Sequence, residues 1–170
     1  MSINDHFFGN DDRVLVPVSE APWRYMGTLH MDGGGTCSAT LIARDVIATA
    51  AHCISSEERV NAAARFDSAD GAQSARAIAY LIDPNFNYRR FSTTDEIDGL
   101  DWALLRLDRP LGDIYGHATV RSITGAGRPL STELMQAGYS WDTGGHLSGN
   151  LRCRMITMHP DNTFAHECDT

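Results

Sequence analysis

Two residues of this sequence, His52 and Asp101, have the type and setting for proton-transfer chemistry. His52 stands in the segment Thr49–Cys53 (TAAHC), directly after an apolar run at residues 41–48 that predicts a strand. Asp101 leads into a second apolar run, where an aspartate carries a desolvation cost unless it is hydrogen bonded. Such a carboxylate can accept the Nδ1–H of an imidazole, fix its tautomer and stabilise the imidazolium that forms when a proton is transferred.

Asp101 also has a structural interpretation, as a strand-end cap or a turn former. Three other aspartates lie nearby in the sequence, but none of them is followed by an apolar run like residues 102–107: Asp95, Asp98 and Asp108. The apolar run after Asp101 therefore favours it as the partner of His52.

The other histidines and the serines carry weaker signals. Four histidines lie in turn or strand contexts, and none has a carboxylate at a spacing that would indicate a catalytic pair. This favours surface or structural roles for His30, His117, His146 and His159. Ser148 lies between glycines and close to His146, so the stretch superficially resembles a nucleophile turn. A flexible loop at residues 145–150 is the simpler interpretation.

A scaffold of short strands has to position these residues. Residues 25–31 alternate before the turn Asp32–Gly35, which is the pattern of a β-hairpin. Further strand candidates are residues 13–18, 36–41, 46–50, 76–82, 102–107, 134–139, 151–158 and 163–166. Only Ser55–Phe66 has much helix propensity. Many short strands with little helix predict an all-β sandwich or barrel.

The composition excludes several kinds of partner. The 170 residues include 42% hydrophobic residues, enough for a core, and carry a scattered net charge of −8. This charge disfavours nucleic acid or an anionic membrane surface. No apolar stretch approaches the roughly 18–20 residues that cross a bilayer, so no membrane attachment is expected. Met1–His6 is too polar for a signal peptide.

Four cysteines allow three disulfide pairings. Their order suggests two local loops, Cys37–Cys53 and Cys153–Cys168, each closing about 15 residues and contributing roughly 3 kcal/mol through loop entropy. Disulfides would place the protein outside the cytosol, secreted or periplasmic, whereas the alternative is four buried thiols in a cytosolic protein. No C-x-x-C or H-x-x-x-H spacing occurs, so neither a metal site nor a cofactor is expected.

Taken in order, these motifs resemble those of the trypsin/chymotrypsin-like serine endopeptidases. In that family TAAHC holds the general base, and a D-x-A-L-L segment like the one at Asp101 holds its orienting carboxylate. Further segments look like the bacterial branch related to the glutamyl (V8-type) endopeptidases: Asp11–Val14, Ala21–Trp23, Cys37–Ile42, Gly138–Tyr139 and Cys168–Thr170 (CDT). The resemblance spans nearly the whole chain.

The resemblance implies an all-β fold of two antiparallel β-barrels. Residues 13–110 would form the first barrel and carry His52 and Asp101. Residues 111–170 would form the first part of a second barrel, which is incomplete in this chain. Residues 1–12 would be a leader and the mature N-terminus, which in this branch would start within His6–Gly9.

The implied reaction is peptide-bond hydrolysis by acyl transfer. His52 would take the proton of a serine hydroxyl and return it to the leaving amine, while Asp101 orients the imidazole ring. In this branch a Gly-x-Ser-Gly stretch with the nucleophile follows CDT, and the 170 residues contain no such stretch. We therefore expect the chain alone to be inactive, with the serine on a following segment or a companion C-terminal fragment.

Three residues near the end of the chain are candidates for the substrate pocket: His166, Asp169 and Thr170. Asp169 stands where trypsin-like members hold a pocket carboxylate, which would favour Arg or Lys at the cleaved bond. In the V8-type branch the aspartate belongs to the CDT motif and the adjoining threonine lines the pocket. The sequence leaves the specificity open.

Two functions are compatible with these observations. The first is a secreted serine endopeptidase that acts on polypeptides. The second is a non-catalytic protease homologue that binds a peptide or protein in the remnant of the cleft. The presence of both His52 and Asp101 favours the first, since a binding module has no physical need for that pair.

Overall fold

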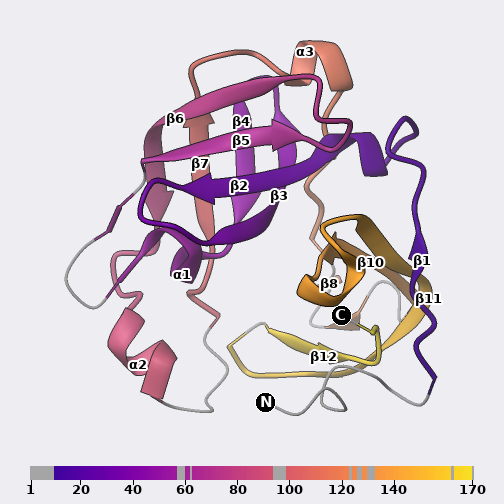
Figure 1. The fold of residues 1–170 in the computed structure, drawn as a ribbon. Coiled ribbons are helices and arrows are strands. Elements are labelled where there is room, and N and C mark those ends of the chain that lie inside the picture. The colour runs from indigo at the N-terminus through magenta and orange to yellow at the C-terminus, as the bar shows by residue number, and fades with distance from the viewer. Residues whose placement is uncertain are drawn as a thin grey trace. The chain divides into compact units, whose positions relative to one another are not determined.

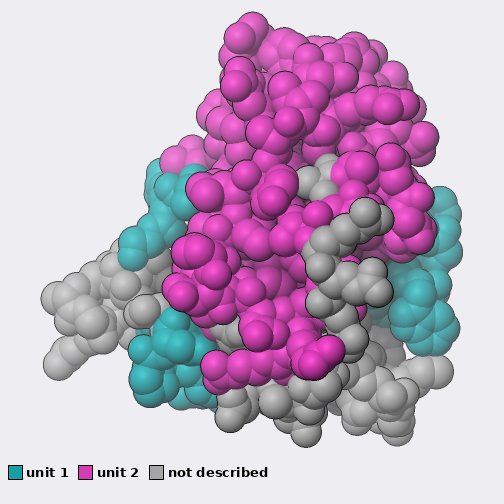
Figure 2. Space-filling view, turned by 90° about the vertical axis from the view of Figure 1, so that its left-hand side faces the viewer, with its two compact units in different colours: residues 1–17, 120–170 teal, residues 18–119 magenta. Residues whose placement is uncertain are grey.

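The computed structural model divides the chain into two compact units (Figure 2). The barrel unit comprises residues 18–119, and the sheet unit comprises residues 1–17 and 120–170. The structure describes residues 10–56, 60–61, 63–93, 99–122, 124–125, 128–129, 133–161 and 163–169. The leader and mature start expected at residues 1–9 lie outside these ranges.

Six antiparallel strands close the barrel unit into a barrel (Figure 1). In the order in which neighbours pair, they are β2 (Met26–Met31), β3 (Thr36–Ala43), β4 (Val46–Thr49), β7 (Ala103–Leu107), β6 (Ser74–Ile82) and β5 (Ala64–Ser68). The pairing of β5 with β2 completes the circle. Closure leaves no strand edge unpaired, and it confirms the prediction of an all-β barrel.

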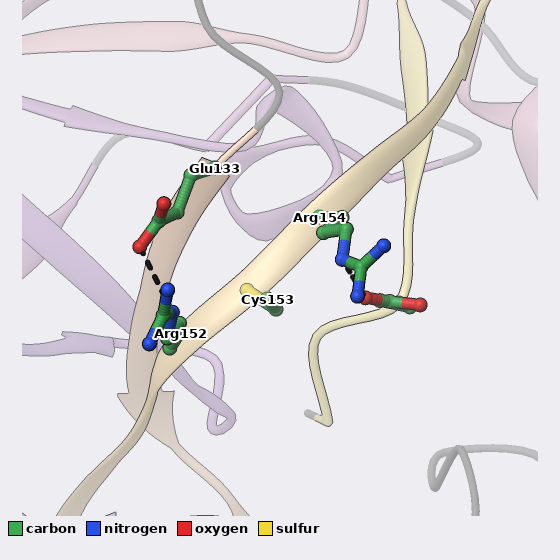
Figure 3. A pocket seen from close by; sticks show the side chains of 5 residues that line it. Glu133, Arg152, Cys153 and Arg154 are labelled. Carbon is green, nitrogen blue, oxygen red and sulfur yellow. Dashed lines mark ion pairs between the residues drawn. The ribbon is translucent and has the colours of Figure 1, made fainter.

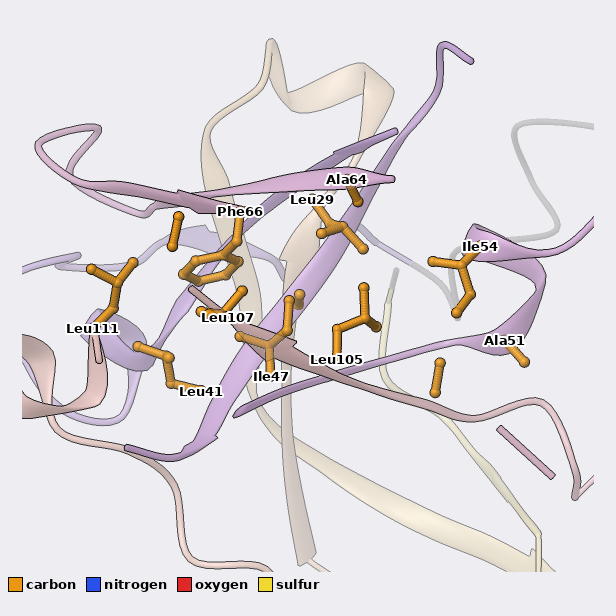
Figure 4. Close-up of a cluster of buried hydrophobic side chains, with 13 residues drawn as sticks. Leu29, Leu41, Ile47, Ala51, Ile54, Ala64, Phe66, Leu105, Leu107 and Leu111 are labelled. Carbon is orange, nitrogen blue, oxygen red and sulfur yellow. The ribbon is translucent and has the colours of Figure 1, made fainter. Parts of the chain in front are cut away.

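Alternating side chains of these strands fill the barrel. Leu105 and Leu107 of β7 are buried, whereas Arg106 between them is exposed, which is the period-two pattern of a strand. Figure 4 shows the side chains that meet in the interior, among them Leu29, Leu41, Ile47, Ile54, Phe66 and Leu111. This core supports the two strands, β4 and β7, that lead to His52 and Asp101.

Short helices connect the strands of the barrel unit. In its described part they are η2 (Trp23–Tyr25), α1 (Ala51–Ile54), α2 (Tyr88–Thr93) and α3 (Gly112–Tyr115). The helix propensity of Ser55–Phe66 is not realised at residues 64–66, because β5 begins at Ala64, and α1 already ends at Ile54. Phe66 points into the core from a strand that pairs on both edges, and this tertiary pairing outweighs local helix propensity.

The sheet unit is built around one long strand, β11 (Leu147–Met158). β1 (Val14–Leu15) and β10 (Glu133–Tyr139) flank β11, and β12 (Phe164–His166) pairs with its last residues, all antiparallel. The described part of this unit also contains the β8 (Thr124–Gly125) and β9 (Arg128–Pro129) ribbon and the turn η3 (Trp141–Thr143). These described strands form a second sheet that does not close, which agrees with an incomplete second barrel.

The units divide the sequence at different places from the expected ranges. Residues 13–17 are expected in the first barrel, but the strand Val14–Leu15 pairs with β11 of the sheet unit. Residues 111–119 are expected in the second barrel, but they belong to the barrel unit. One reason is that the N–H of Gly112 donates to the carbonyl of Arg44 at 2.8 Å.

Each unit contains one disulfide. Cys37–Cys53 joins β3 to α1 with a Cα–Cα distance of 6.3 Å, and Cys153–Cys168 joins β11 to the segment after β12 with a distance of 5.0 Å. Both pairings suggested by the order of the cysteines are present, and no free thiol remains. Within the described ranges, no helix has the length and apolar character to span a membrane.

Candidate active site

His52 is held where a barrel strand passes into a one-turn helix. β4 ends at Thr49, whose hydroxyl donates to the carbonyl of Ser38 at 2.9 Å. Helix α1 then begins at Ala51, which is fully buried, and Cys53 in the same helix is bonded to β3 through its disulfide. A hydrogen-bonded strand end and a covalent crosslink therefore flank His52 and fix its backbone.

Asp101 reaches the same place from the neighbouring strand. β4 and β7 are antiparallel, and Thr49 pairs with Ala103. The end of β4 consequently lies beside the start of β7. Because His52 comes just after β4 and Asp101 just before β7, this pairing brings the two side chains together.

Two hydrogen bonds join His52 to Asp101. Oδ2 of Asp101 lies 2.7 Å from Nδ1 of His52, and Oδ1 accepts the backbone N–H of His52 at 2.8 Å. An ionised carboxylate can only accept, so the ring donates from Nδ1, and the lone pair of the neutral imidazole is on Nε2. The pair thus has the tautomer that a general base requires.

The surroundings of Asp101 favour its ionised form. Burial raises the pKa of Asp101, but the hydrogen bonds from the His52 ring and from the backbone N–H groups of His52 and Ala51 outweigh burial, and the pKa lies below its ordinary value of 3.8. The side chain of Asp101 is 18% exposed and that of His52 is 39% exposed. The carboxylate is shielded while the imidazole remains accessible to a reacting group.

Asp108, one of the neighbouring aspartates, has another place in the fold. Asp108 accepts the backbone N–H of Arg76 at 2.9 Å and so stabilises the end of a strand pair. This is the strand-end role that the sequence also allowed for Asp101. Asp95 and Asp98 lie outside the described residues. Asp101 is the aspartate that the barrel brings to His52.

Comparison with known proteins agrees with this geometry. The family model described as Trypsin matches residues 15–167. The chain belongs to the trypsin family. A solved structure of a Glu endopeptidase in complex with MPD superposes with a TM-score of 0.70 at 19% identity, covering 89% of this chain and 71% of that one. The protease Anisep from Arthrobacter nicotinovorans gives a TM-score of 0.61 at 19% identity, covering 83% and 68%.

At this identity the two solved structures show the fold. They confirm a chymotrypsin-like fold for this trypsin-family chain, with one closed six-stranded barrel and a partial second barrel. None of the curated proteins matches the chain in sequence.

The candidate pocket residues of this trypsin-family chain lie in the sheet unit. Asp169 is buried, and its Oδ2 accepts the backbone N–H of Asp12 at 2.9 Å. His166 in β12 accepts the N–H of Cys168 through Nδ1 at 3.1 Å. His166 and Asp169 lie on one short segment that the Cys153–Cys168 disulfide joins to β11, while Thr170 lies outside the described residues. Residue 12 is a partner that sequence reasoning missed.

A cavity of about 440 Å³ also lies in the sheet unit (Figure 3). Its lining consists of Glu133, Arg152, Cys153, Arg154 and Glu167. Arg152 pairs with Glu133 at 3.1 Å, and Arg154 pairs with Glu167 at 3.5 Å (Figure 3). The charges of the lining therefore balance one another, and these side chains contain neither a nucleophile nor a histidine.

One group of potential metal ligands was found among the described residues. Cys37, His52 and Cys53 place their ligand atoms within 4.8 Å of one another. The two sulfurs are bonded to each other, so neither is the thiolate that metal coordination by cysteine needs. The group belongs to the His52 site and supports no metal chemistry in its disulfide form.

Ser148 has no setting for a nucleophile. It lies in β11 and pairs with Leu15 on one side and Gly138 on the other, and it is 4% exposed. The prediction of a flexible loop at residues 145–150 is wrong from residue 147 onward, because strand pairing on both edges orders this stretch.

Proposed function

We propose that this chain supplies the general base and its orienting carboxylate to a secreted or periplasmic serine endopeptidase that cleaves polypeptides by acyl transfer. The observation that carries the proposal is the 2.7 Å hydrogen bond between Nδ1 of His52 and Asp101, with the second bond from the backbone N–H of His52. Membership of the trypsin family supports the same reaction class.

The reaction follows from the tautomer of His52. Nε2 accepts the proton of a serine hydroxyl while the serine oxygen bonds to the peptide carbonyl carbon. The imidazolium, stabilised by Asp101, then gives the proton to the amide nitrogen as the C–N bond breaks. Water then takes the place of the serine as the nucleophile and passes its proton to Nε2 as it attacks the acyl-enzyme. The imidazolium returns this proton to the serine oxygen as the acid is released. Asp101 keeps its charge throughout because its pKa is lowered.

The nucleophile belongs, in this proposal, to polypeptide outside the 170 residues, on a following segment or a companion C-terminal fragment. The Gly-x-Ser-Gly pattern is absent from the sequence, and Ser148, the serine whose surroundings most resemble it, is buried in β11. The two disulfides support an oxidising location.

Labelling with an organophosphonate probe tests the proposal. The chain is prepared alone and together with the polypeptide encoded after Thr170. We expect no label on residues 1–170 in either preparation, and label with peptide hydrolysis only when the second polypeptide is present. Label within residues 1–170 would contradict the proposal that the nucleophile lies outside these residues. The absence of both label and hydrolysis would favour the non-catalytic, peptide-binding homologue.

A further inference from the structure

Asp169 is the one charged side chain among the buried residues that the structure describes, with an exposed fraction of 1%. Its Oδ2 accepts the backbone N–H of Asp12 at 2.9 Å, across a sequence separation of 157. An ionised carboxylate buried to this degree needs hydrogen-bond donors, because its desolvation is costly. The backbone N–H of residue 12 is one of these donors.

The segment that carries this N–H, residues 11–16, is here called the N-terminal strap. On one side of Asp12 the guanidinium of Arg13, whose side chain is only 5% exposed, binds both Asp11 and Asp142. Its bonds to Asp142 measure 2.5 and 3.2 Å. Hydrogen bonds to these two carboxylates raise the pKa of Arg13 above its ordinary value. The arginine therefore ties the strap to turn η3.

The other end of the strap is tied to β11. Val14 and Leu15 form β1, which pairs with β11, and the N–H of Val16 donates to the carbonyl of Leu147 at 3.3 Å. Strand pairing alone therefore accounts for residues 14–16. The contact at Asp12 needs another partner, and Asp169 provides it.

Asp169 is itself held by the residues that precede it in the chain. Cys168, directly before it, is bonded to Cys153 in β11, and the N–H of Cys168 donates to Nδ1 of His166 at 3.1 Å. The carboxylate consequently projects from a crosslinked backbone. The backbone that carries Asp169 is thus held by contacts that do not involve the strap.

We propose that Asp169 is a positioning residue that anchors the N-terminal strap, and that it is not the group that recognises a cationic substrate side chain. A pocket carboxylate that selects Arg or Lys has to meet the incoming cation, but Asp169 is buried and already accepts a backbone N–H. The part about specificity rests on the proposed endopeptidase function. The anchoring does not.

Amide hydrogen exchange measures the anchoring directly. Asp169→Leu removes the acceptor at similar size, and we expect the N–H of residue 12 to exchange roughly tenfold faster or more in this variant, as expected for the loss of one buried hydrogen bond. Asp169→Asn keeps a carbonyl acceptor and should restore most of the protection. Asp12→Ala is the matched control, because it keeps the backbone N–H and should leave the exchange rate unchanged after correction for intrinsic rates.

The outcomes show whether Asp169 holds the N–H of residue 12 or not. Equal exchange at residue 12 in the wild type and in Asp169→Leu would overturn the proposal, as would Asp169→Asn exchanging as fast as Asp169→Leu. If Asp169→Leu does not fold, the comparison of Asp169→Asn with the wild type decides, because a retained acceptor predicts retained protection and full exposure contradicts it.

The specificity is measured in the serine-bearing enzyme with peptides that differ only at the cleaved residue. Asp169→Asn should change the kcat/KM ratio of the Arg and Ala peptides by less than about threefold. A loss confined to the Arg peptide and exceeding about a hundredfold would overturn the proposal. If the wild type hydrolyses none of the peptides, the proposed function fails, and hydrogen exchange still decides the anchoring.

Discussion

In the proposed reaction, His52 is the more exposed group that takes up the proton, and Asp101 is the more shielded group that orients it. Asp101 accepts from both the ring and the backbone of His52, so it fixes the ring in position as well as its tautomer. A carboxylate with only the ring contact would permit more rotation of the imidazole. The hydrogen bond from the backbone N–H of His52 to Asp101 could not be predicted from the residue pattern.

Replacing Asp101 with asparagine tests the tautomer argument. The amide can donate to Nδ1, which would move the imidazole proton to Nε2 and remove the base. We expect kcat of the serine-bearing enzyme to fall by about 10³ to 10⁴, with little change in KM. Asp108→Asn is the matched control and should alter kcat by less than about threefold, because its backbone acceptor role is kept. A decrease below about tenfold in Asp101→Asn would contradict the assignment.

The lowered pKa of Asp101 also predicts a pH dependence of stability. A carboxyl group whose pKa is lower in the folded than in the unfolded state stabilises the fold above its unfolded pKa, and this contribution is lost as the pH falls through the folded pKa. The stability difference between the wild type and Asp101→Asn should therefore shrink as the pH falls from about 5 through the lowered pKa of Asp101. Urea unfolding at several pH values measures it. A difference that is constant or grows towards acid would contradict the prediction.

At the scale of elements, the site depends on the register of β4 against β7. A shift of one residue would turn alternate side chains to the opposite face and expose the core residues of both strands. The pairing of Ile47 with Leu105 in the core therefore also sets the place of His52 and Asp101 at the ends of these strands. Packing far from the reacting atoms determines the geometry of the site.

The close contact of β2 with β5 predicts a sensitive glycine. A Cβ at Gly27 would collide with the carbonyl oxygen of Asp67 and the ring of Phe66, and backbone atoms of a closed barrel yield little. Gly27→Ala should lower the free energy of unfolding by about 3 kcal/mol. Gly33→Ala, in a turn with open space around the added Cβ, is the control and should change it by less than about 0.5 kcal/mol. Urea unfolding of both variants checks the contrast, and equal effects would refute it.

At the scale of the whole molecule, each unit has its own crosslink. Cys37–Cys53 lies within the barrel unit, and Cys153–Cys168 lies within the sheet unit beside Asp169. Neither crosslink joins the two units. The disulfides therefore stabilise each unit separately, at the histidine in one and at the strap anchor in the other.

Removing the disulfides one at a time should destabilise the protein. For loops of 16 and 15 residues, the double variants Cys37→Ala/Cys53→Ala and Cys153→Ala/Cys168→Ala should each lose about 3 kcal/mol of unfolding free energy. Denaturant unfolding with and without a reducing agent measures the loss. A variant lacking all four cysteines should not respond to the reductant. An unchanged stability after removal of either crosslink would contradict the prediction for that unit.

The sequence by itself predicted His52 and Asp101 as a pair, favoured the two local disulfide pairings and predicted the all-β class. These features follow from residue types beside apolar strands and from motif order, which are local signals. Only the tertiary structure decided that residues 64–68 form a strand, since strand pairing on both sides competes with a helical preference. It also decided that Asp169 meets the backbone of Asp12. A backbone N–H carries no side-chain signature, so a contact between such distant residues becomes visible only when the chain folds.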